Sequence, residues 1–330
     1  MTKDYEHNVP YNDGWKEKSG YLGFKMSNDY LFRAIMQKDE ETLKNVVAAF
    51  LGVGPEKIED VTVTNPIVLG DSVNDKEMHL DVHVILNYMD HLDLEMQTIQ
   101  HEGWIERSVM YACSSFGNLS HGGSYQDARS IWQIDFCDFS PFKHFPSFYA
   151  DFKLINTKNI KNVYTDKLRI TNVYLTHIDL ADTRDPIEAG LVRWARLFKA
   201  KTWEELHMLA QESKFIDQAV STAWQLSEDE KIREQMRRRE ENEWIWNAHL
   251  KAEEEAKARE QEAKAREQEA KAREQEAKAE AKAANERAMA AQEETTAIKV
   301  ELENAKKRAD EVEKENAELK KRLLELENKR

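Results

Sequence analysis

The chain has 330 residues, of which 33% are charged, and a formal net charge of −14. Residues 1–250 hold 28 Lys and Arg against 40 Asp and Glu, whereas residues 251–330 are nearly balanced, with 20 against 22. This acidity argues against unspecific duplex binding by the whole surface, since Lys and Arg neutralise the phosphates in such binding, and it leaves room only for a local basic patch. The two cysteines, Cys113 and Cys137, form no CxxC pair and give no support to a zinc finger or a disulfide framework.

Residues 1–20 are polar and charged and lack the apolar core of a signal peptide, and we expect residues 1–25 to form a loose lead-in. No run of about 18 apolar residues, the length that spans a bilayer, occurs in the sequence. All eight tryptophans precede residue 251, so the hydrophobic core is expected before that point. These features predict a cytoplasmic protein without membrane contact.

The first predicted element is a helix that starts at the N-cap residues around Asn28 and ends at about residue 51, before a glycine. A β-branched run predicts a strand at residues 61–69. Apolar and polar residues then alternate at 78–86 and again at 91–97, and this pattern is typical of half-buried strands.

A helix is expected next at residues 102–119, with its buried side formed by Ile105, Val109 and Ala112. Strands follow at 130–139 and 168–178, and helices dominate from residue 186 onward. The order α-β-β-β-α-β predicts an α/β fold with a helical extension.

The two alternating strands form the most informative part of the sequence. The apolar residues of both strands carry even numbers. In an antiparallel pair, directly opposed residues share a face, so the numbers of two opposed residues must add up to an even number. An even sum favours a loop with an odd number of residues, about three. Asp81 then lies opposite Glu95 or Gln97. Two carboxylates with an amide beside them suit Mg²⁺ or Mn²⁺, which prefer oxygen ligands. The pattern is short, however, and a polar strand face open to solvent is the more common origin of such a spacing.

Several short motifs in this order resemble the PD-(D/E)XK nuclease family transposases, the recombination-promoting nuclease group. The resemblance covers about residues 25–250 and departs from the family pattern at Arg33, where the family has Lys. The motifs that carry it are Asp29, Phe32 and Arg33 of a D-x-x-F-K helix, Leu80-Asp81-Val82, Glu95-Met96-Gln97 of an E-x-Q strand, and Arg107 and Tyr111 of an R-x-x-x-Y helix.

The resemblance implies a restriction-endonuclease-like core at residues 26–180, a helical extension at 181–250, and metal-dependent cleavage of DNA. Asp81 and Glu95 would be the metal ligands, with Mg²⁺ or Mn²⁺ as cofactor. Gln97 would take the place of a lysine found in the wider superfamily, and Asp29 would add an acidic contact. Because a neutral amide can orient water or phosphate but cannot supply a positive charge, a nuclease fold that binds or assembles without efficient cleavage is the alternative.

Other functional interpretations involve residues near the same strands. A zinc site formed by His79, His83 and His91 with a carboxylate is one alternative. Arg107 and Tyr111, four residues apart on one helix face, are candidates for contact with nucleic acid, and RNA is not distinguished from DNA. Basic stretches at 193–199 and 231–239 are interpreted mainly as amphipathic helices.

Residues 251–330 are predicted to form a charged helix that ends in a coiled coil. From residue 230 onward there is neither Pro nor Gly, and Glu and Lys or Arg recur four residues apart. Near the end, apolar residues alternate by four and three, with Asn316 at one a position, which favours a parallel homodimer. The predicted seam includes Ile298, Leu302, Val312, Asn316, Leu319, Leu323 and Leu326.

Overall fold

The computed structural model describes residues 13–67, 69, 82–87, 90–116, 125 and 128–327, with side chains of the last helix described to residue 324. The chain divides into two units, Met1–Leu250 and Lys251–Arg330. Asp81 and His79 lie outside the described residues, as do parts of the predicted strands at 61–69 and 78–86.

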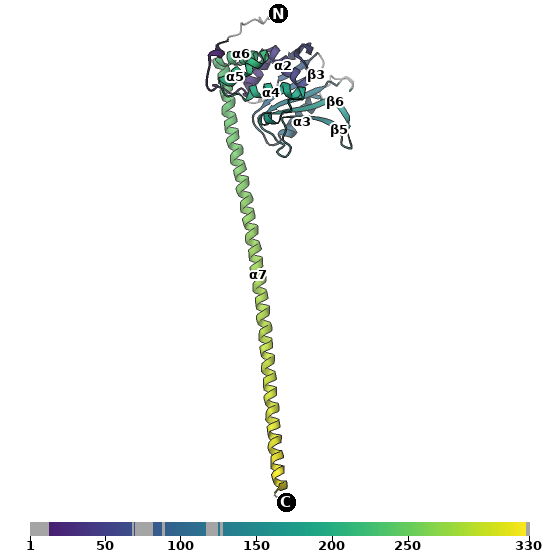
Figure 1. Cartoon of the computed structure of the whole chain (residues 1–330), viewed down its shortest axis with the longest axis vertical. Helices are drawn as coiled ribbons and strands as arrows, with labels where there is room; N and C mark the ends of the chain where they lie inside the picture. The colour runs from purple at the N-terminus through teal and green to yellow at the C-terminus, as the bar shows by residue number, and fades with distance from the viewer. Residues whose placement is uncertain are drawn as a thin grey trace. The chain divides into compact units, whose positions relative to one another are not determined.

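The first unit is built on a six-stranded sheet in the order β1-β2-β3-β4-β6-β5 (Figure 1). Antiparallel pairing joins β1 to β2, β2 to β3 and β5 to β6, whereas β3, β4 and β6 run parallel. The strands are β1 Val61–Val63, β2 Val82–Leu86, β3 Asp90–Gln97, β4 Ile131–Cys137, β5 Tyr149–Asn156 and β6 Asn159–Tyr174.

Seven α-helices are described, and the first part of the chain follows the predicted order α-β-β-β-α-β, except that two helices, α1 and α2, stand in place of the first. The mixed α/β architecture is therefore confirmed. The helices are α1 Asp29–Lys38, α2 Glu40–Leu51, α3 Trp104–Phe116, α4 Pro186–Lys199, α5 Trp203–Glu212, α6 Lys214–Glu228 and α7 Glu230–Glu327; short 3-10 helices occur at Asp13–Glu17, Pro55–Lys57 and Leu175–Leu180.

The predicted hairpin is confirmed in its register. Val82 lies opposite Leu94 and Leu86 opposite Asp90, so every described pair has the expected even sum and three residues remain for the loop. The first loop residue, Asn87, has a positive φ of 47°, a conformation that Asn tolerates better than most residues.

Two predictions about element boundaries were wrong, and one strand was missed. The single helix up to residue 51 is broken at Asp39, because the Asp39 carboxylate accepts a hydrogen bond from the backbone N–H of Thr42 at 3.0 Å and starts α2. The strand expected at 168–178 is β6, which begins at Asn159 and ends at Tyr174. Its partner β5 was not predicted.

One face of the sheet carries an apolar core. Even-numbered residues of β2, β3 and β4 point to this face and meet α1, α2 and α4. Phe136 of β4 lies at its centre, in edge-to-face contact with Phe32, Phe50 and Phe198 at centroid distances of 5.8, 5.4 and 5.1 Å. Trp194, Leu197 and Phe198 of α4 are buried here, so the interpretation of residues 193–199 as an amphipathic helix is confirmed.

The opposite face of the sheet is polar and is covered by α3. It carries the odd-numbered residues of β3 and β4. The buried residues of α3 are Trp104, Ser108 and Ala112, whereas Ile105 and Val109 are exposed. The prediction for Ala112 is thus confirmed and those for Ile105 and Val109 were wrong, because the buried side of α3 follows positions 104, 108 and 112, which are four residues apart and share one helix face.

None of the helices in the described ranges combines the length and the apolar composition needed to cross a membrane. The second unit belongs to α7, which continues without interruption through its whole described length. Predicted ion pairs between residues four apart are present, for example Glu260 with Lys264 and Glu262 with Arg266, both at 2.6 Å. The described apolar residues of the predicted seam are exposed in the single chain, with Ile298, Leu302 and Leu323 at 56–60%.

Candidate active site

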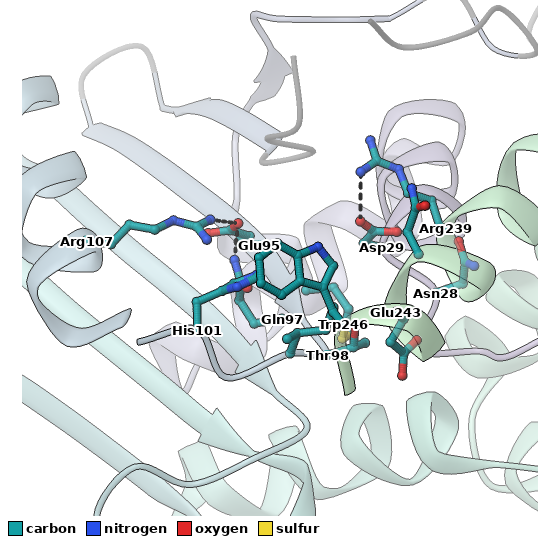
Figure 2. Close-up of a pocket in the computed structure, with 13 residues that line it drawn as sticks. Asn28, Asp29, Glu95, Gln97, Thr98, His101, Arg107, Arg239, Glu243 and Trp246 are labelled. Atoms are coloured by element: carbon teal, nitrogen blue, oxygen red, sulfur yellow. Dashed lines mark hydrogen bonds and ion pairs between the residues drawn. The ribbon is translucent and has the colours of Figure 1, made fainter. Parts of the chain in front are cut away.

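A cavity of about 120 Å³ lies at the end of β3, with room for several water molecules. Its walls come from four elements of the first unit: the start of α1, the end of β3 with the following loop, α3, and the first turns of α7 (Figure 2). The lining residues are Asn28, Asp29, Glu95, Met96, Gln97, Thr98, Ile99, His101, Arg107, Arg239, Asn242, Glu243 and Trp246.

Glu95 and Gln97 enter this cavity from neighbouring odd positions of β3. Both are buried, with 9% and 7% of their surface exposed, so the interpretation of an open polar strand face was wrong for these residues. Glu95 Oε1 accepts hydrogen bonds from Gln97 Nε2 and from Arg107 Nη2, the latter at 2.8 Å. A buried carboxylate is stable only with such partners, and Arg107 supplies the compensating charge.

Asp29 lines the same cavity from the first turn of α1. Its Oδ1 accepts a hydrogen bond from the backbone N–H of Tyr30 at 2.8 Å, and its Oδ2 lies 3.8 Å from Nη1 of Arg239. Burial raises the pKa of the Asp29 carboxyl, while the positive charge of Arg239 opposes the shift. Figure 2 shows the pair Asp29 and Arg239 and the pair Glu95 and Arg107 as two separate groups around the cavity.

The predicted nucleic-acid residues have different surroundings. Arg107 lines the cavity and pairs with Glu95, and its guanidinium carbon lies 5.4 Å from the centre of the Tyr111 ring. Tyr111 is partly exposed on α3 and does not line the cavity. The structure therefore brings Asp29, Glu95, Gln97 and Arg107 together around the cavity, whereas Tyr111 contacts Arg107 from outside it.

A second buried carboxylate, Asp135, lies beside Glu95 in the parallel pairing of β3 and β4. Only 1% of Asp135 is exposed. Gln133 Nε2 donates a hydrogen bond to Asp135 Oδ1 at 2.7 Å. With its amide nitrogen facing the carboxylate, the Asn172 side chain donates a second hydrogen bond to Asp135 Oδ2 at 3.1 Å. The alternation of β4 was not recognised in the sequence because Trp132 to Cys137 includes only two polar residues, Gln133 and Asp135.

Other cavity residues were also missed. Arg239 belongs to the basic stretch at 231–239, and this was the only signal that pointed to it. His101 and Trp246 contact each other edge to face, with ring centres 5.1 Å apart. Burial lowers the pKa of His101, and the charge of Arg107 lowers it further. The two rings come from the loop after β3 and from α7, and no sequence pattern links these segments.

The histidines that the structure describes near β2 and β3 do not assemble a zinc site. His83 contacts Asp93, and His91 Nε2 lies 2.7 Å from Nη1 of Arg129. Burial lowers the pKa of His91, and Arg129 adds to the effect. Within the described part of the chain, no three His, Cys, Asp or Glu side chains are grouped as metal ligands.

The oxygen donors around the cavity nevertheless suit a hard cation. Glu95 and Asp29 are carboxylates, Gln97 offers an amide oxygen, and no sulfur lines the cavity apart from the thioether of Met96. Mg²⁺ is usually held by one or two carboxylates and keeps several waters, and the cavity has room for them. The donor set therefore fits the ion that the sequence resemblance implies.

A sheet with an E-x-Q strand, a covering helix and a polar cavity at the strand end defines a nuclease-like α/β protein. Comparison with protein families agrees, since the model of the PD-(D/E)XK nuclease family transposases matches residues 26–253. The chain belongs to this family, and the resemblance is confirmed. No match was found among curated proteins or among solved structures.

Proposed function

We propose that this protein is a metal-dependent endonuclease that hydrolyses phosphodiester bonds in DNA. The observation that carries the proposal is the common cavity of Asp29, Glu95, Gln97 and Arg107 in a chain of the PD-(D/E)XK nuclease family. The family implies a nucleic acid as substrate. The cavity adds buried Glu95, the Gln97 amide and two arginines, which can hold a cation and stabilise negative charge on a phosphodiester.

The proposed metal ligands are Asp81 and Glu95, with Asp29 as a further acidic contact. In the described hairpin, the numbers of two opposed residues add up to 176, as for Val82 and Leu94. The same register continued by one residue would pair position 81 with Glu95. This supports a shared cation between two carboxylates across the hairpin, with Mg²⁺ or Mn²⁺ as the ion.

Each side chain has a proposed task. Mg²⁺, when bound, supplies Lewis-acid stabilisation and an activated water. Arg107 orients Glu95 through its hydrogen bond, and Arg239 contributes positive charge at the wall of the cavity. Gln97, as a neutral amide, orients water or a phosphate oxygen. Because Gln97 cannot supply the charge of a lysine, we expect slower cleavage than a lysine at this position would give.

The test is nicking of supercoiled plasmid by the purified protein with and without Mg²⁺. Asp81→Ala should abolish the Mg²⁺-dependent nicking. The matched control is Asp90→Ala, since Asp90 is an exposed aspartate of the same hairpin that does not line the cavity. Undiminished nicking by Asp81→Ala, or an equal loss in both variants, would contradict the assignment. Plasmid and single-stranded RNA tested in parallel separate DNA from RNA as substrate.

We also propose that α7 pairs two copies of the chain in parallel. The seam has exposed apolar residues at Leu302, Leu319 and Leu323, and such a seam needs a partner helix. Asn316 at an a position favours two parallel helices in register. Two paired sites suit cutting of both strands of a duplex. Sedimentation equilibrium should give a dimer for the wild type and a monomer for Leu302→Lys/Leu323→Lys. The matched control Lys307→Leu lies off the seam and should not dissociate the dimer.

The second candidate is a nuclease fold that binds or assembles without efficient cleavage. Gln97 at the usual lysine position is the observation that favours it. Isothermal titration with Mg²⁺ and Mn²⁺ separates the two functions. Absence of metal binding in a stably dimeric wild-type protein would support the assembly module, whereas binding that is lost in Asp81→Ala would support the nuclease.

A further inference from the structure

Strands β5 and β6 form a two-stranded ribbon that extends from the sheet beyond the end of their neighbour β4. Pairing of β4 with β6 starts at Leu168, whereas β5 and β6 pair on as far as Asn156 and Asn159. Residues 154–165, here called the projecting ribbon, therefore have no third strand beside them in the described part of the chain. Figure 1 shows β5 and β6 next to each other at one edge of the first unit.

The projecting ribbon is exposed on both faces. All residues from 151 to 164 are exposed, and Ile160 and Tyr164 reach 71% and 86%. Leu154, Ile155 and Val163 are exposed as well. A two-stranded hairpin is marginally stable alone, and an uncovered apolar edge invites association. The ribbon therefore has the properties of a surface that contacts a partner.

Its charge indicates which partner. Residues 154–165 hold two lysines, Lys158 and Lys161, and no acidic residue, in a chain whose net charge is −14. A third lysine, Lys153, directly precedes the ribbon. Lys153 is 3.4 Å from Asp151 and is thus partly neutralised. Lys158 and Lys161 are at the tip of the ribbon. The backbone N–H of Lys158 donates to the side chain of Asn156 at 3.0 Å, and the backbone N–H of Lys161 donates to the side chain of Asn159 at 3.3 Å. Neither lysine side chain has an ion pair among the residues that the structure describes.

We propose that the projecting ribbon enters a groove of duplex DNA, with Lys158 and Lys161 at the phosphates. This inference rests on the proposed function, because it takes DNA as the ligand. The major groove of B-DNA is about 12 Å wide and admits a two-stranded β-ribbon. Ile160 and Tyr164 then contact bases or sugars. The ribbon supplies two positive charges for duplex binding in a chain that is acidic as a whole.

The experiment measures binding of the full-length protein to a fluorescein-labelled duplex of about 30 base pairs by fluorescence anisotropy. EDTA is present so that no metal-dependent cleavage occurs, and the affinity is determined at several salt concentrations. The slope of log K against log salt is negative, and each lost phosphate contact reduces its magnitude by about 0.9. Lys158→Gln/Lys161→Gln should therefore bind more weakly, and the magnitude of its slope should be smaller by about 1.8.

Two matched variants separate charge at the ribbon from charge in general. Lys158→Arg/Lys161→Arg keeps the charge and should keep the affinity and the slope. Lys38→Gln/Lys57→Gln removes two exposed lysines elsewhere on the first unit and should leave the slope unchanged. Since all four lysines are exposed, thermal unfolding of the variants should match that of the wild type, which checks that each variant is folded.

An unchanged slope in the ribbon variant, an equal change in the Lys38 and Lys57 variant, or absence of duplex binding by the wild type would overturn the inference. A ribbon variant that loses self-association but keeps duplex binding would also overturn it, in favour of contact with a second copy. Nicking distinguishes the two proposals. Ribbon-dependent binding without nicking supports the ribbon and contradicts the nuclease, whereas nicking with ribbon-independent binding contradicts the ribbon alone.

Discussion

The two faces of β3 and β4 have different environments, one apolar and one polar. Even-numbered residues meet α1, α2 and α4 in an apolar core around Phe136. Odd-numbered residues lie under α3 and include the buried carboxylates Glu95 and Asp135. Side chains that are adjacent in sequence thus lie in opposite environments, because successive residues of a strand point to opposite faces.

This difference separates stability from function. Apolar burial on the even face stabilises the fold roughly in proportion to the area removed from water. Buried carboxylates on the odd face cost desolvation free energy and persist only with donors such as Arg107 and Gln133. We therefore expect substitutions on the even face to lower stability, and substitutions on the odd face to lower activity.

The largest expected effect comes from the even face. Phe136→Ala removes a fully buried ring that contacts three other aromatic rings. The free energy of unfolding should fall by about 3–5 kcal/mol, as is usual when a buried aromatic is truncated. Urea denaturation followed by circular dichroism measures it. A loss below about 1 kcal/mol would show that this face is not the core.

The matching substitution on the odd face is Glu95→Gln, which keeps the shape of the side chain and removes its charge. Plasmid nicking should fall by about 100-fold or more, because a proposed metal ligand is lost. The free energy of unfolding should change much less than in Phe136→Ala, since the amide oxygen of the new Gln side chain can still accept the hydrogen bond from Arg107. A variant that nicks at the wild-type rate, or that unfolds as readily as Phe136→Ala, would remove the distinction between the faces.

Much of this contrast could be predicted from the sequence. The alternation in residues 91–97 indicated the hairpin and its even-sum register, and it assigned Glu95 and Gln97 to one face. These properties depend on neighbouring residues in one strand and on the geometry of the pleat. The family motifs added Asp29 and Arg107, and both line the cavity with the strand residues.

The remainder depends on contacts between distant segments. Arg239 and Trp246 reach the cavity because α7 packs beside α1, and no local pattern encodes this packing. Strand β5 was missed because its alternation of apolar and polar residues is short, running only from Ala150 to Leu154 before it breaks at Ile155. The break at Asp39 was missed because one capping carboxylate, which also accepts a hydrogen bond from Gln218 at 2.7 Å, ends the helical pattern.

A smaller, pH-dependent effect is expected at Asp29, which starts a helix of the apolar core and also lines the cavity. Burial raises its pKa above the ordinary 3.8, so the folded chain retains a proton in a pH range where the unfolded chain has released it. The contribution of Asp29 to stability is therefore most favourable below the ordinary pKa and declines as pH rises through the raised value.

Asp29→Asn cannot ionise and should escape this decline. The free energy of unfolding of the variant should therefore improve relative to wild type between about pH 3 and about pH 7. Urea denaturation across this range measures the difference, and Asp90→Asn, at an exposed aspartate, is the control. A difference that is constant with pH would show that Asp29 is as hydrated as a surface carboxylate.

The smallest effect tests whether α3 seals the odd face from water. Cys137 lies at the end of that face and is fully buried, whereas Cys113 on α3 is exposed. Burial raises the pKa of the Cys137 thiol well above its ordinary value, and the nearby carboxylates of Asp135 and Glu95 raise it further. Since the thiolate is the reactive form, Cys137 should resist modification in the folded protein.

An aromatic disulfide reagent at about pH 8 should therefore modify one thiol per folded chain and two in urea. Cys113→Ser should leave no thiol that reacts quickly before unfolding. Rapid reaction of Cys137 in the folded Cys113→Ser variant would mean that water and reagent reach the odd face beneath α3. The carboxylates of the odd face would then be hydrated. The two faces would differ in the polarity of their residues but not in their burial from water.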